Sequence, residues 1–516
     1  MLTSDESTSL ASDGSKDDVM RDTSRFTAVV LGVIIALGVL VLAMTVIMLS
    51  SGSKFHEKTF GTETQPGITE NWRYTAIGAT GTTPQPWFKS TVTSLTSQLT
   101  TTTTKESYGH LTKEPFTSTE KSIITVSLST ARTPEQGRLV SLLCTMGDKL
   151  GAPHMLPEDG PCDYLFYDSL FKKGFVLNGT LDSSMGLFIN HHWWVKKAVT
   201  GTGLAYKYTK ELFNWLDEDS TALPYLLNIF LKFRIRNYGC LDTASNGYDG
   251  LVMKQMLLIL KSIDSYFTRE QPHDEKCVTV FALPPADPKI EDAYAEHFLY
   301  SYTPSIVVII SHYLEGDNTF EDCRVVQPAM LKRPPLLTTN SSYTYDMSTA
   351  AETMRKLVER GVNSQWALSV TMKGRWNTLK AGQPAAFLSE CVHDPAAESF
   401  GSYTEVCQDP SFINGSRYKT GAYGPLYYNR SDGRTFTFDN ETTHVDKLCK
   451  VRTQQGSYAF GVAAYDVDYD DFSNACSSTN YFGKFSRLFC LKGLLKYTKD
   501  GFREPGKLAD CLKECQ

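Results

Sequence analysis

The sequence predicts an α/β fold, a (β/α)8 barrel, and two observations support this prediction. From Arg138 onward, short apolar runs alternate with stretches of helical periodicity, which is the pattern of a mainly parallel sheet. Seven such runs, together with a weaker one near Tyr238, supply the eight strands of a barrel that needs roughly 250 residues or more. The seven runs are 138–144, 163–171, 185–190, 277–283, 305–310, 366–372 and 458–467.

Each run is predicted as a strand because its residues are apolar and often β-branched or aromatic. Helices are expected between the runs. Thr349 and Glu352 form a capping box, and Gly361 ends this helix ahead of the strand at 366–372. A second helical stripe of apolar residues covers 252–267.

The region before the barrel divides into three segments. Residues 1–25 are acidic and lack apolar periodicity, so they predict a disordered cytosolic tail. The uncharged run from Phe26 to Leu49 is long enough, at about 1.5 Å per residue, to cross a lipid bilayer core of roughly 30 Å. We interpret it as a transmembrane helix, because the apolar core of a signal peptide is shorter. Residues 50–136 are rich in Thr and Ser and predict a mucin-like stalk or a plain flexible linker.

Cysteines and glycosylation sequons lie on one side of this apolar run only. Both features are typical of an oxidising, lumenal compartment, so we predict a single-pass type II plasma-membrane glycoprotein with an extracellular ectodomain. The five sequons are at Asn178, Asn340, Asn414, Asn429 and Asn440. The twelve cysteines are Cys144, Cys162, Cys240, Cys277, Cys323, Cys391, Cys407, Cys449, Cys476, Cys490, Cys511 and Cys515.

Composition and motifs exclude several functions. The net charge of −6 is small for 516 residues and argues against a nucleic-acid partner. The chain has no G-x-S-x-G and no H-E-x-x-H motif, the commonest signatures of serine hydrolases and zinc proteases. The acidic cluster from Asp466 to Asp471 lacks the Gly and Glu of a calcium-binding EF-hand loop, and His191 and His192 are adjacent, which disfavours joint ligation. We expect neither a metal nor a cofactor.

Several segments carry a resemblance to a known family. LLCTMGDKL (142–150) and PCDYLFYDSLF (161–171) resemble the first two strands of the chitinases and chitinase-like proteins of glycoside hydrolase family 18. GVNSQWALSVTMKGRWNTL (361–379) resembles the seventh strand, and GVAAYDVDYDDFSNAC (461–476) resembles the eighth strand with its loop.

The resemblance implies the domain organisation. It implies a barrel over 137–500 with a small insertion at 383–450, between strands seven and eight, followed by a cysteine-containing tail at 501–516. It also implies a disulfide between Cys144 and Cys162. A bridge between Cys391 and Cys407 is suggested only by their proximity in the sequence.

The chain departs from the family pattern where the family has its catalytic groups. The resemblance places Tyr248 where the family has its proton-donating Glu, and there is no Glu anywhere in 219–269. The hydroxyl of Tyr248 titrates too high to replace a general acid. Asp242 remains as a carboxyl in this stretch, but it is not part of a recognisable acid–base arrangement. His312 and Tyr313 stand where the family has a Tyr-Asp pair that holds the substrate's acetamido group, and Tyr465 stands where it has a Trp. These departures imply an inactive relative.

Two function classes follow. The first is a non-catalytic chitinase-like glycoprotein that binds a glycan or a protein through the C-terminal face of its barrel. Its candidate glycan-binding residues are Tyr465 and Trp376, as stacking surfaces, with Arg375 and Asp466 as polar neighbours; the alternative is that the two aromatic rings only fill the top of the barrel. The second class is a divergent glycosidase that acts on N-acetylglucosamine-containing glycans.

Overall fold

The structure is a computed structural model of the chain, and it describes most of the part that follows residue 140. The described residues are 141–170, 183–192, 194–243, 249–270, 277–286, 288–314, 322–337, 343–392, 399–414, 424–456, 458–499 and 506–515.

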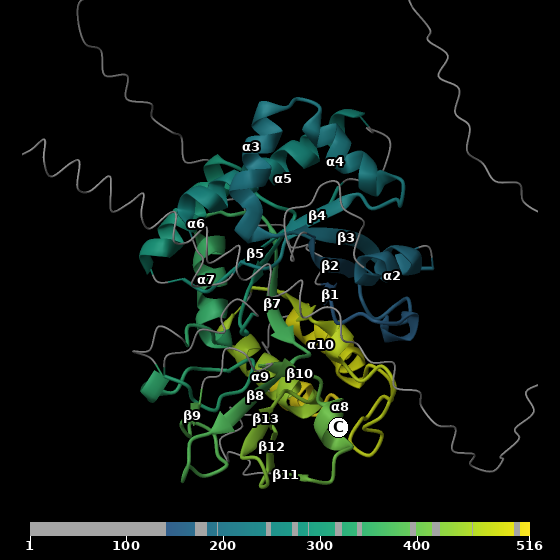
Figure 1. Cartoon of the computed structure of the whole chain (residues 1–516). Helices are drawn as coiled ribbons and strands as arrows, with labels where there is room; N and C mark the ends of the chain where they lie inside the picture. The colour runs from purple at the N-terminus through teal and green to yellow at the C-terminus, as the bar shows by residue number, and fades with distance from the viewer. Residues whose placement is uncertain are drawn as a thin grey trace, which may run out of the picture. The chain divides into compact units, whose positions relative to one another are not determined.

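Eight parallel strands close into a barrel (Figure 1), so the predicted barrel fold is confirmed. Around the barrel the strand order is β1-β14-β7-β6-β5-β4-β3-β2, which means that the last strand in the sequence closes the barrel against the first. The strands are β1 (Leu142–Met146), β2 (Tyr164–Leu170), β3 (Val199–Leu204), β4 (Asn237–Cys240), β5 (Thr279–Leu283), β6 (Ile306–Ile309), β7 (Gln365–Thr371) and β14 (Gly461–Tyr465).

Helices connect the strands and surround the barrel (Figure 1). Their apolar faces and the outward side chains of the strands form the larger of the buried clusters. The α-helices are α2 (Ser183–His192), α3 (Thr209–Glu218), α4 (Ala222–Leu231), α5 (Gly250–Glu270), α6 (Pro288–Tyr300), α7 (Met347–Glu359), α8 (Thr404–Cys407), α9 (Glu441–Gln454), α10 (Ser486–Lys499) and α11 (Gly506–Leu512). The short 3-10 helices are η1 (Pro153–Met155), η2 (Tyr206–Tyr208), η5 (Pro335–Leu337) and η6 (Val467–Tyr469).

Two sequence predictions in this layer are wrong in detail. The apolar run at 185–190 is not a strand but lies within α2, because its buried residues Met185, Phe188 and Ile189 follow helical spacing. The helix α7 begins earlier than the predicted capping box. Its N-cap is Asp346, whose carboxylate accepts a hydrogen bond from the backbone N–H of Thr349.

The strand β3 was not predicted, because its two glycines interrupt the apolar pattern. Both glycines are needed inside the barrel. A Cβ atom on Gly201 would overlap the ring of Phe166, and one on Gly203 would overlap the backbone oxygen of Asp168. The missing side chain at Gly201 therefore makes the room that the large ring of Phe166 fills, and the one at Gly203 allows β3 to approach the backbone of Asp168 closely.

A second, smaller sheet is inserted between β7 and β14, with strand order β10-β8-β13-β12-β11 and β9 paired to β8. Its strands are β8 (Gly374–Leu379), β9 (Cys391–Val392), β10 (Phe400–Gly401), β11 (Phe412–Asn414), β12 (Leu426–Asn429) and β13 (Arg434–Thr437). One of its faces packs on α8 through Tyr403 and Val406. The other face meets the loop after β6, where the hydroxyl of Thr437 donates a hydrogen bond to the backbone oxygen of Val326.

Five disulfides tie these parts together, and Cys144 is bonded to Cys162. The suggested Cys391–Cys407 bridge is wrong. Each of these cysteines instead pairs with a residue distant in the sequence, because the second sheet brings the loop after β6 and the loop after β14 next to it. The remaining bridges are Cys323–Cys391, Cys407–Cys476, Cys449–Cys511 and Cys490–Cys515. Cys240 and Cys277 are buried and take no part in these five bridges.

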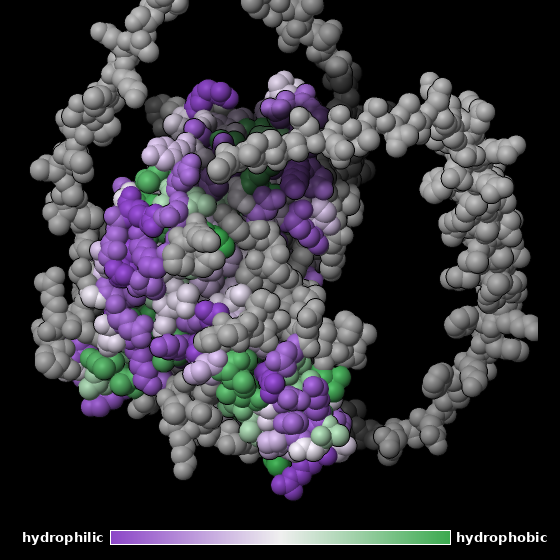
Figure 2. All heavy atoms as spheres, turned by 90° about the vertical axis from the view of Figure 1, so that its left-hand side faces the viewer, coloured by the Kyte–Doolittle hydropathy of each residue, from purple (hydrophilic) through white to green (hydrophobic). Residues whose placement is uncertain are grey.

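The predicted location is contradicted. In the part of the chain that the structure describes, no helix combines the length and the apolar character that crossing a membrane requires. The single-pass type II plasma-membrane assignment is therefore withdrawn. The segments 1–25, 26–49 and 50–136 lie outside the described residues. On the face drawn in Figure 2, hydrophilic side chains cover most of the described surface, and the hydrophobic areas between them are small.

Candidate functional site

An ion pair lies at the C-terminal mouth of the barrel, just beyond the ends of β7 and β14. The ammonium of Lys373 and the Oδ1 of Asp466 are 2.9 Å apart, and both side chains are more than 90% buried. The hydroxyl of Thr371 donates to the other oxygen of Asp466 at 2.7 Å. The backbone N–H of Asp466 donates to the hydroxyl of Thr145 on β1 at 3.0 Å. The pair therefore links three neighbouring strands across the mouth.

Asp466 adopts a backbone conformation that ordinary side chains avoid. Its φ and ψ angles of 58° and 46° lie in the left-handed region, where Asp is one of the better tolerated residues. Burial alone would raise the pKa of the Asp466 carboxyl, but the charge of Lys373, together with His312 and the hydrogen bond from Thr371, holds the pKa below its usual value. Lys373 also lies over the rings of Tyr469, at 4.9 Å, and Phe400, at 5.5 Å. Asp466 is therefore a fixed, ionised carboxylate with little freedom to reach a ligand.

His312 follows β6 and lies beside this pair. It is fully buried, and its Nδ1 lies 2.7 Å from the hydroxyl of Ser369 on β7. Its ring is 4.6 Å from that of Tyr465, centroid to centroid. Burial lowers the pKa of His312 to about 4, so the imidazole is neutral near pH 7. Its Nε2 has no hydrogen-bond partner among the described residues.

Tyr465, the residue before Asp466 at the end of β14, extends across the mouth towards β4. It is 2% exposed, and its hydroxyl donates to the backbone oxygen of Leu241, just beyond β4, at 3.1 Å. Burial raises the pKa of this phenol well above its ordinary value, so it stays protonated. The ring thus spans the barrel from β14 to β4, and its faces are in contact with protein, not with solvent.

Asp468, in η6, is the least satisfied carboxyl of the cluster. It is buried, and neither of its oxygens accepts a hydrogen bond from another described residue. A methyl group on Gly147 would lie 3.5 Å from carboxylate oxygens of both Asp168 and Asp468, so the two acids border the same small space. Burial, together with the charge of Asp466, raises the pKa of Asp468 to about 7. Asp468 is therefore a weak acid poised to exchange a proton near neutral pH.

The other two predicted glycan-binding residues lie in the second sheet, on opposite faces of β8. Arg375 is buried, and its guanidinium lies 5.4 Å from the ring centre of Tyr313 at the top of the barrel. Trp376 is half-buried and points the other way. The guanidinium of Arg434 covers its ring at 4.0 Å, and the ring of Phe436 lies 4.5 Å away. Of the four predicted residues, Tyr465 and Asp466 are neighbours in the sequence at the barrel mouth, and Trp376 lies on the face of β8 opposite Arg375.

The positions expected to correspond to lost catalytic groups have structural contacts. Asp242 follows β4, and its Oδ1 accepts a hydrogen bond from the backbone N–H of Tyr206 at 2.9 Å. Tyr313 packs edge-on against Tyr345 at 5.4 Å in the loop that fills the top of the barrel. Tyr248 lies outside the described residues. No group of three His, Cys, Asp or Glu side chains that could hold a metal ion occurs in the described ranges.

Of the five predicted glycosylation sequons, some lie outside the described residues and others have contacts that the structure shows. Asn178 and Asn340, and the side chain of Asn414, lie outside what the structure describes. Asn429 is buried, and its Nδ2 donates to the hydroxyl of Ser411 at 3.2 Å. Asn440 is the N-cap of α9, where its Oδ1 accepts from the backbone N–H of Thr443. Glycosylation at these positions stays a prediction.

Sequence reasoning missed Lys373 and the role of Asp468. Lys373 stands beside the Gly374-Arg375 pair, but a lone lysine there carries no sign of a buried partner. Asp468 was considered only as one member of an acidic cluster. The signal that could have singled it out is its position between Val467 and Tyr469, two large residues that are also buried.

Comparison with known proteins identifies the fold. No protein-family model matches the chain, and no curated protein matches it. Chitinases and chitinase-like proteins of known structure share its fold at low identity. An immunomodulatory active chitinase from Trichuris suis, TsES1, is 13% identical with a TM-score of 0.52, covering 69% of this chain and 100% of that one. Human YKL-39, described as a pseudo-chitinase with retained chitooligosaccharide binding, is 13% identical with a TM-score of 0.51 over 69% and 99% of the two chains. The group IV chitinase of Ostrinia furnacalis, in complex with allosamidin, is 14% identical with a TM-score of 0.51 over the same shares. The chain therefore has a chitinase-like (β/α)8 barrel.

Proposed function

We propose that the chain is a non-catalytic glycan-binding protein built on a chitinase-like barrel. The observation that supports this most is the closure of the barrel mouth by the chain's own groups. The Lys373–Asp466 ion pair and the ring of Tyr465 occupy the centre of the mouth, and each is held by contacts to other strands. Active sites of such barrels lie at this face, so closing its centre removes the place where a scissile bond would sit.

A glycan would then bind at the rim of the same face. The loops after β1 and β14 place rings near the surface: His154 is exposed, and its ring lies 5.3 Å from that of the half-buried Phe472. Lys149, also exposed, lies over the ring of Tyr469 at 5.4 Å. Sugar rings present apolar C–H patches that stack on such aromatic faces, and exposed Lys149 offers a hydrogen-bond donor beside them.

The test is a glycan array with the purified chain, followed by titration with chitotetraose and an assay for its hydrolysis. We expect binding with a dissociation constant of roughly micromolar to millimolar and no turnover. Phe472→Ala should weaken binding, and Tyr465→Phe, which changes a buried hydroxyl only, should leave it unaltered. Absence of binding to every glycan on the array would refute glycan recognition and favour a protein partner.

A second candidate function rests on Asp468. A divergent glycosidase needs a carboxyl that is protonated near neutral pH, and Asp468 has a pKa of about 7. Its burial argues against access to a glycosidic oxygen. Turnover of chitotetraose that Asp468→Asn abolishes would establish this function in place of the first.

A further inference from the structure

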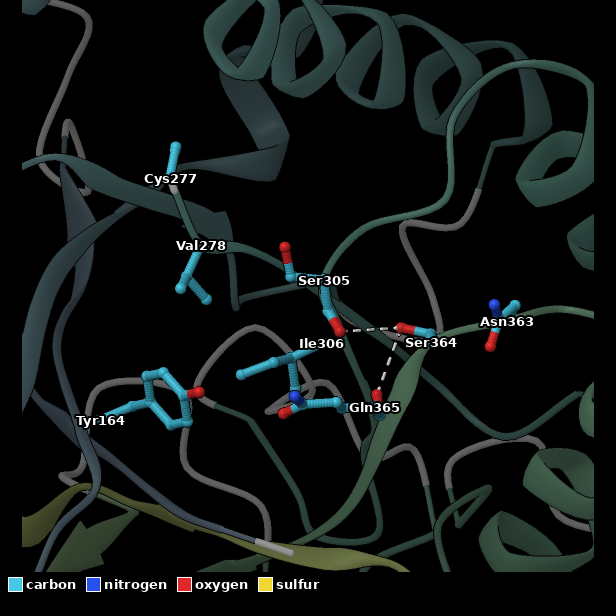
Figure 3. Close-up of a pocket in the computed structure, with 8 residues that line it drawn as sticks. All are labelled: Tyr164, Cys277, Val278, Ser305, Ile306, Asn363, Ser364 and Gln365. Atoms are coloured by element: carbon cyan, nitrogen blue, oxygen red, sulfur yellow. Dashed lines mark hydrogen bonds between the residues drawn. The ribbon is translucent and has the colours of Figure 1, made fainter. Parts of the chain in front are cut away.

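A cavity of about 330 Å³ lies at the N-terminal end of the barrel, opposite the mouth described above (Figure 3). Its walls come from the first residues of the strands. Tyr164 begins β2, Ile306 begins β6, Gln365 begins β7, and Val278 directly precedes β5. Cys277, Ser305, Asn363 and Ser364 complete the lining.

The cavity has fixed walls. The hydroxyl of Ser364 donates to the backbone oxygen of Pro304 at 2.8 Å, and the backbone N–H of Gln365 donates to Ser305 at 3.0 Å. The backbone N–H of Val278 donates to the side-chain oxygen of Asn237 at 2.8 Å. A site whose walls are tied in this way is preformed, so a ligand would pay little of the ordering cost that weakens binding.

Above the cavity the barrel interior is filled. Phe166 and Val308 belong to the buried cluster of the next layer, together with the small side chain of Ala367 on β7. This layer separates the cavity from the ion pair at the mouth, so the two ends of the barrel are independent.

The chemistry of the lining selects the ligand. None of the eight side chains that line the cavity carries a charge near neutral pH. Burial, together with the charge of Asp163, raises the pKa of Tyr164, so the Tyr164 hydroxyl is a neutral hydrogen-bond donor and acceptor. Gln365 makes no side-chain hydrogen bond to another described residue, and its Oε1 is buried without a donor. Its amide can offer either a donor or an acceptor, because the two ends interchange by rotation about the last side-chain bond. Figure 3 shows the Tyr164 hydroxyl and the Gln365 amide pointing toward the space between them.

We propose that this cavity binds a small, neutral, hydroxyl-bearing molecule of about the size of a hexose. At the ~30 Å³ that one water occupies in the liquid, the cavity has room for roughly eleven non-hydrogen atoms. The ligand's hydroxyls pair with Tyr164 and Gln365, and its C–H face lies on the partly exposed side chain of Val278. Charged ligands are excluded, because no side chain in the lining offers a counter-charge.

The experiment is ligand-observed saturation-transfer NMR on the whole purified chain, with D-glucose, N-acetylglucosamine and myo-inositol as probes. At about 20 mM, well above the ~1 mM dissociation constant expected for so small a ligand, at least one probe should receive saturation. Gln365→Met, which keeps the length of the side chain, and Tyr164→Phe should each weaken binding by about tenfold or less, the loss of one or two neutral hydrogen bonds.

Tyr465→Phe is the matched control, since it removes a phenol hydroxyl at the other end of the barrel, and it should leave the affinity unchanged. Circular dichroism of each variant verifies that the fold is intact. The proposal is overturned if no probe receives saturation from the unaltered chain. It is also overturned if affinity is the same in Gln365→Met, Tyr164→Phe and the unaltered chain, because the probe would then bind elsewhere.

Discussion

Replacing Asp468 by Asn should stabilise the protein, by an amount that grows as the pH rises from 3.8, the ordinary pKa of Asp, towards about 7. The carboxyl of Asp468 is buried without a hydrogen bond from another described residue and shares its surroundings with Asp168 and Asp466. Its pKa rises from 3.8 to about 7 on folding. The folded state therefore holds the proton more tightly than the unfolded state does. The stabilisation from this proton is fully present below the unfolded pKa and is lost as pH rises through the folded pKa.

The magnitude follows from the size of the shift. A rise of about three units corresponds to about 4 kcal/mol, of which roughly 3 kcal/mol should be lost between about pH 5 and pH 8. Asn has nearly the same shape and cannot ionise, so the variant escapes this loss. Relative to the unaltered chain, the variant's free energy of unfolding should therefore increase by up to about 3 kcal/mol over that range.

Urea unfolding at a series of pH values measures this difference. The control is Asp471→Asn. The carboxylate of Asp471 accepts hydrogen bonds from the backbone N–H groups of Ala475 and Cys476; although burial opposes it, these bonds lower its pKa. Its stabilisation is present above the unfolded pKa, so the control variant should be destabilised at pH 8. A destabilised Asp468→Asn at pH 8, or an effect that is equal at pH 5 and pH 8, would contradict the raised pKa.

Two further predictions concern the mouth and the second sheet. Lys373→Met should cost about 3–5 kcal/mol, because it leaves the buried charge of Asp466 uncompensated. Adding Asp466→Asn, which removes that charge and tolerates the left-handed backbone, should recover part of this loss in the same urea assay. Equal stability of the single and double variants would refute the pairing. Cys323→Ser should cost about 2–5 kcal/mol of stability, and peptide mapping by mass spectrometry should find Cys391 as a free thiol in that variant alone. A Cys391–Cys407 bridge in the unaltered chain would refute the disulfide connectivity of the second sheet.

Local sequence patterns were sufficient for most of the barrel. The runs that became β5, β6 and β7 are apolar and β-branched, and a fully buried parallel strand needs little else. The pattern failed at β3, where the interior requires glycine so that Phe166 has room. It failed at 185–190 because a short apolar run suits a strand and a buried helix face equally well.

The candidate site was harder to predict because its contacts join distant strands. The family resemblance pointed to Tyr465 and Asp466, but nothing near either residue indicates that Lys373 is the partner of Asp466. The sequence does not show how far each candidate side chain is buried in the folded protein. Tyr465 and Trp376 are aromatic residues in plausible places for sugar stacking, yet the hydroxyl of one is bonded to Leu241 and the ring of the other lies under Arg434.

The position of β14 between β1 and β7 has a consequence for synthesis in the cell. β1 can pair with β2 soon after both leave the ribosome, but its other edge has no partner until β14, near the end of the chain, has been made. The unpaired edge of a strand can hydrogen-bond to a strand of another chain. Because the chain is synthesised from its N-terminus, this edge of β1 stays exposed until β14 has been made. The Cys144–Cys162 bridge joins β1 to the segment before β2, so it can form while the barrel is still open. The bridges of Cys449 and Cys490 require α11 and the last residues. Truncation before β14 should therefore leave an aggregating chain that already contains the first bridge.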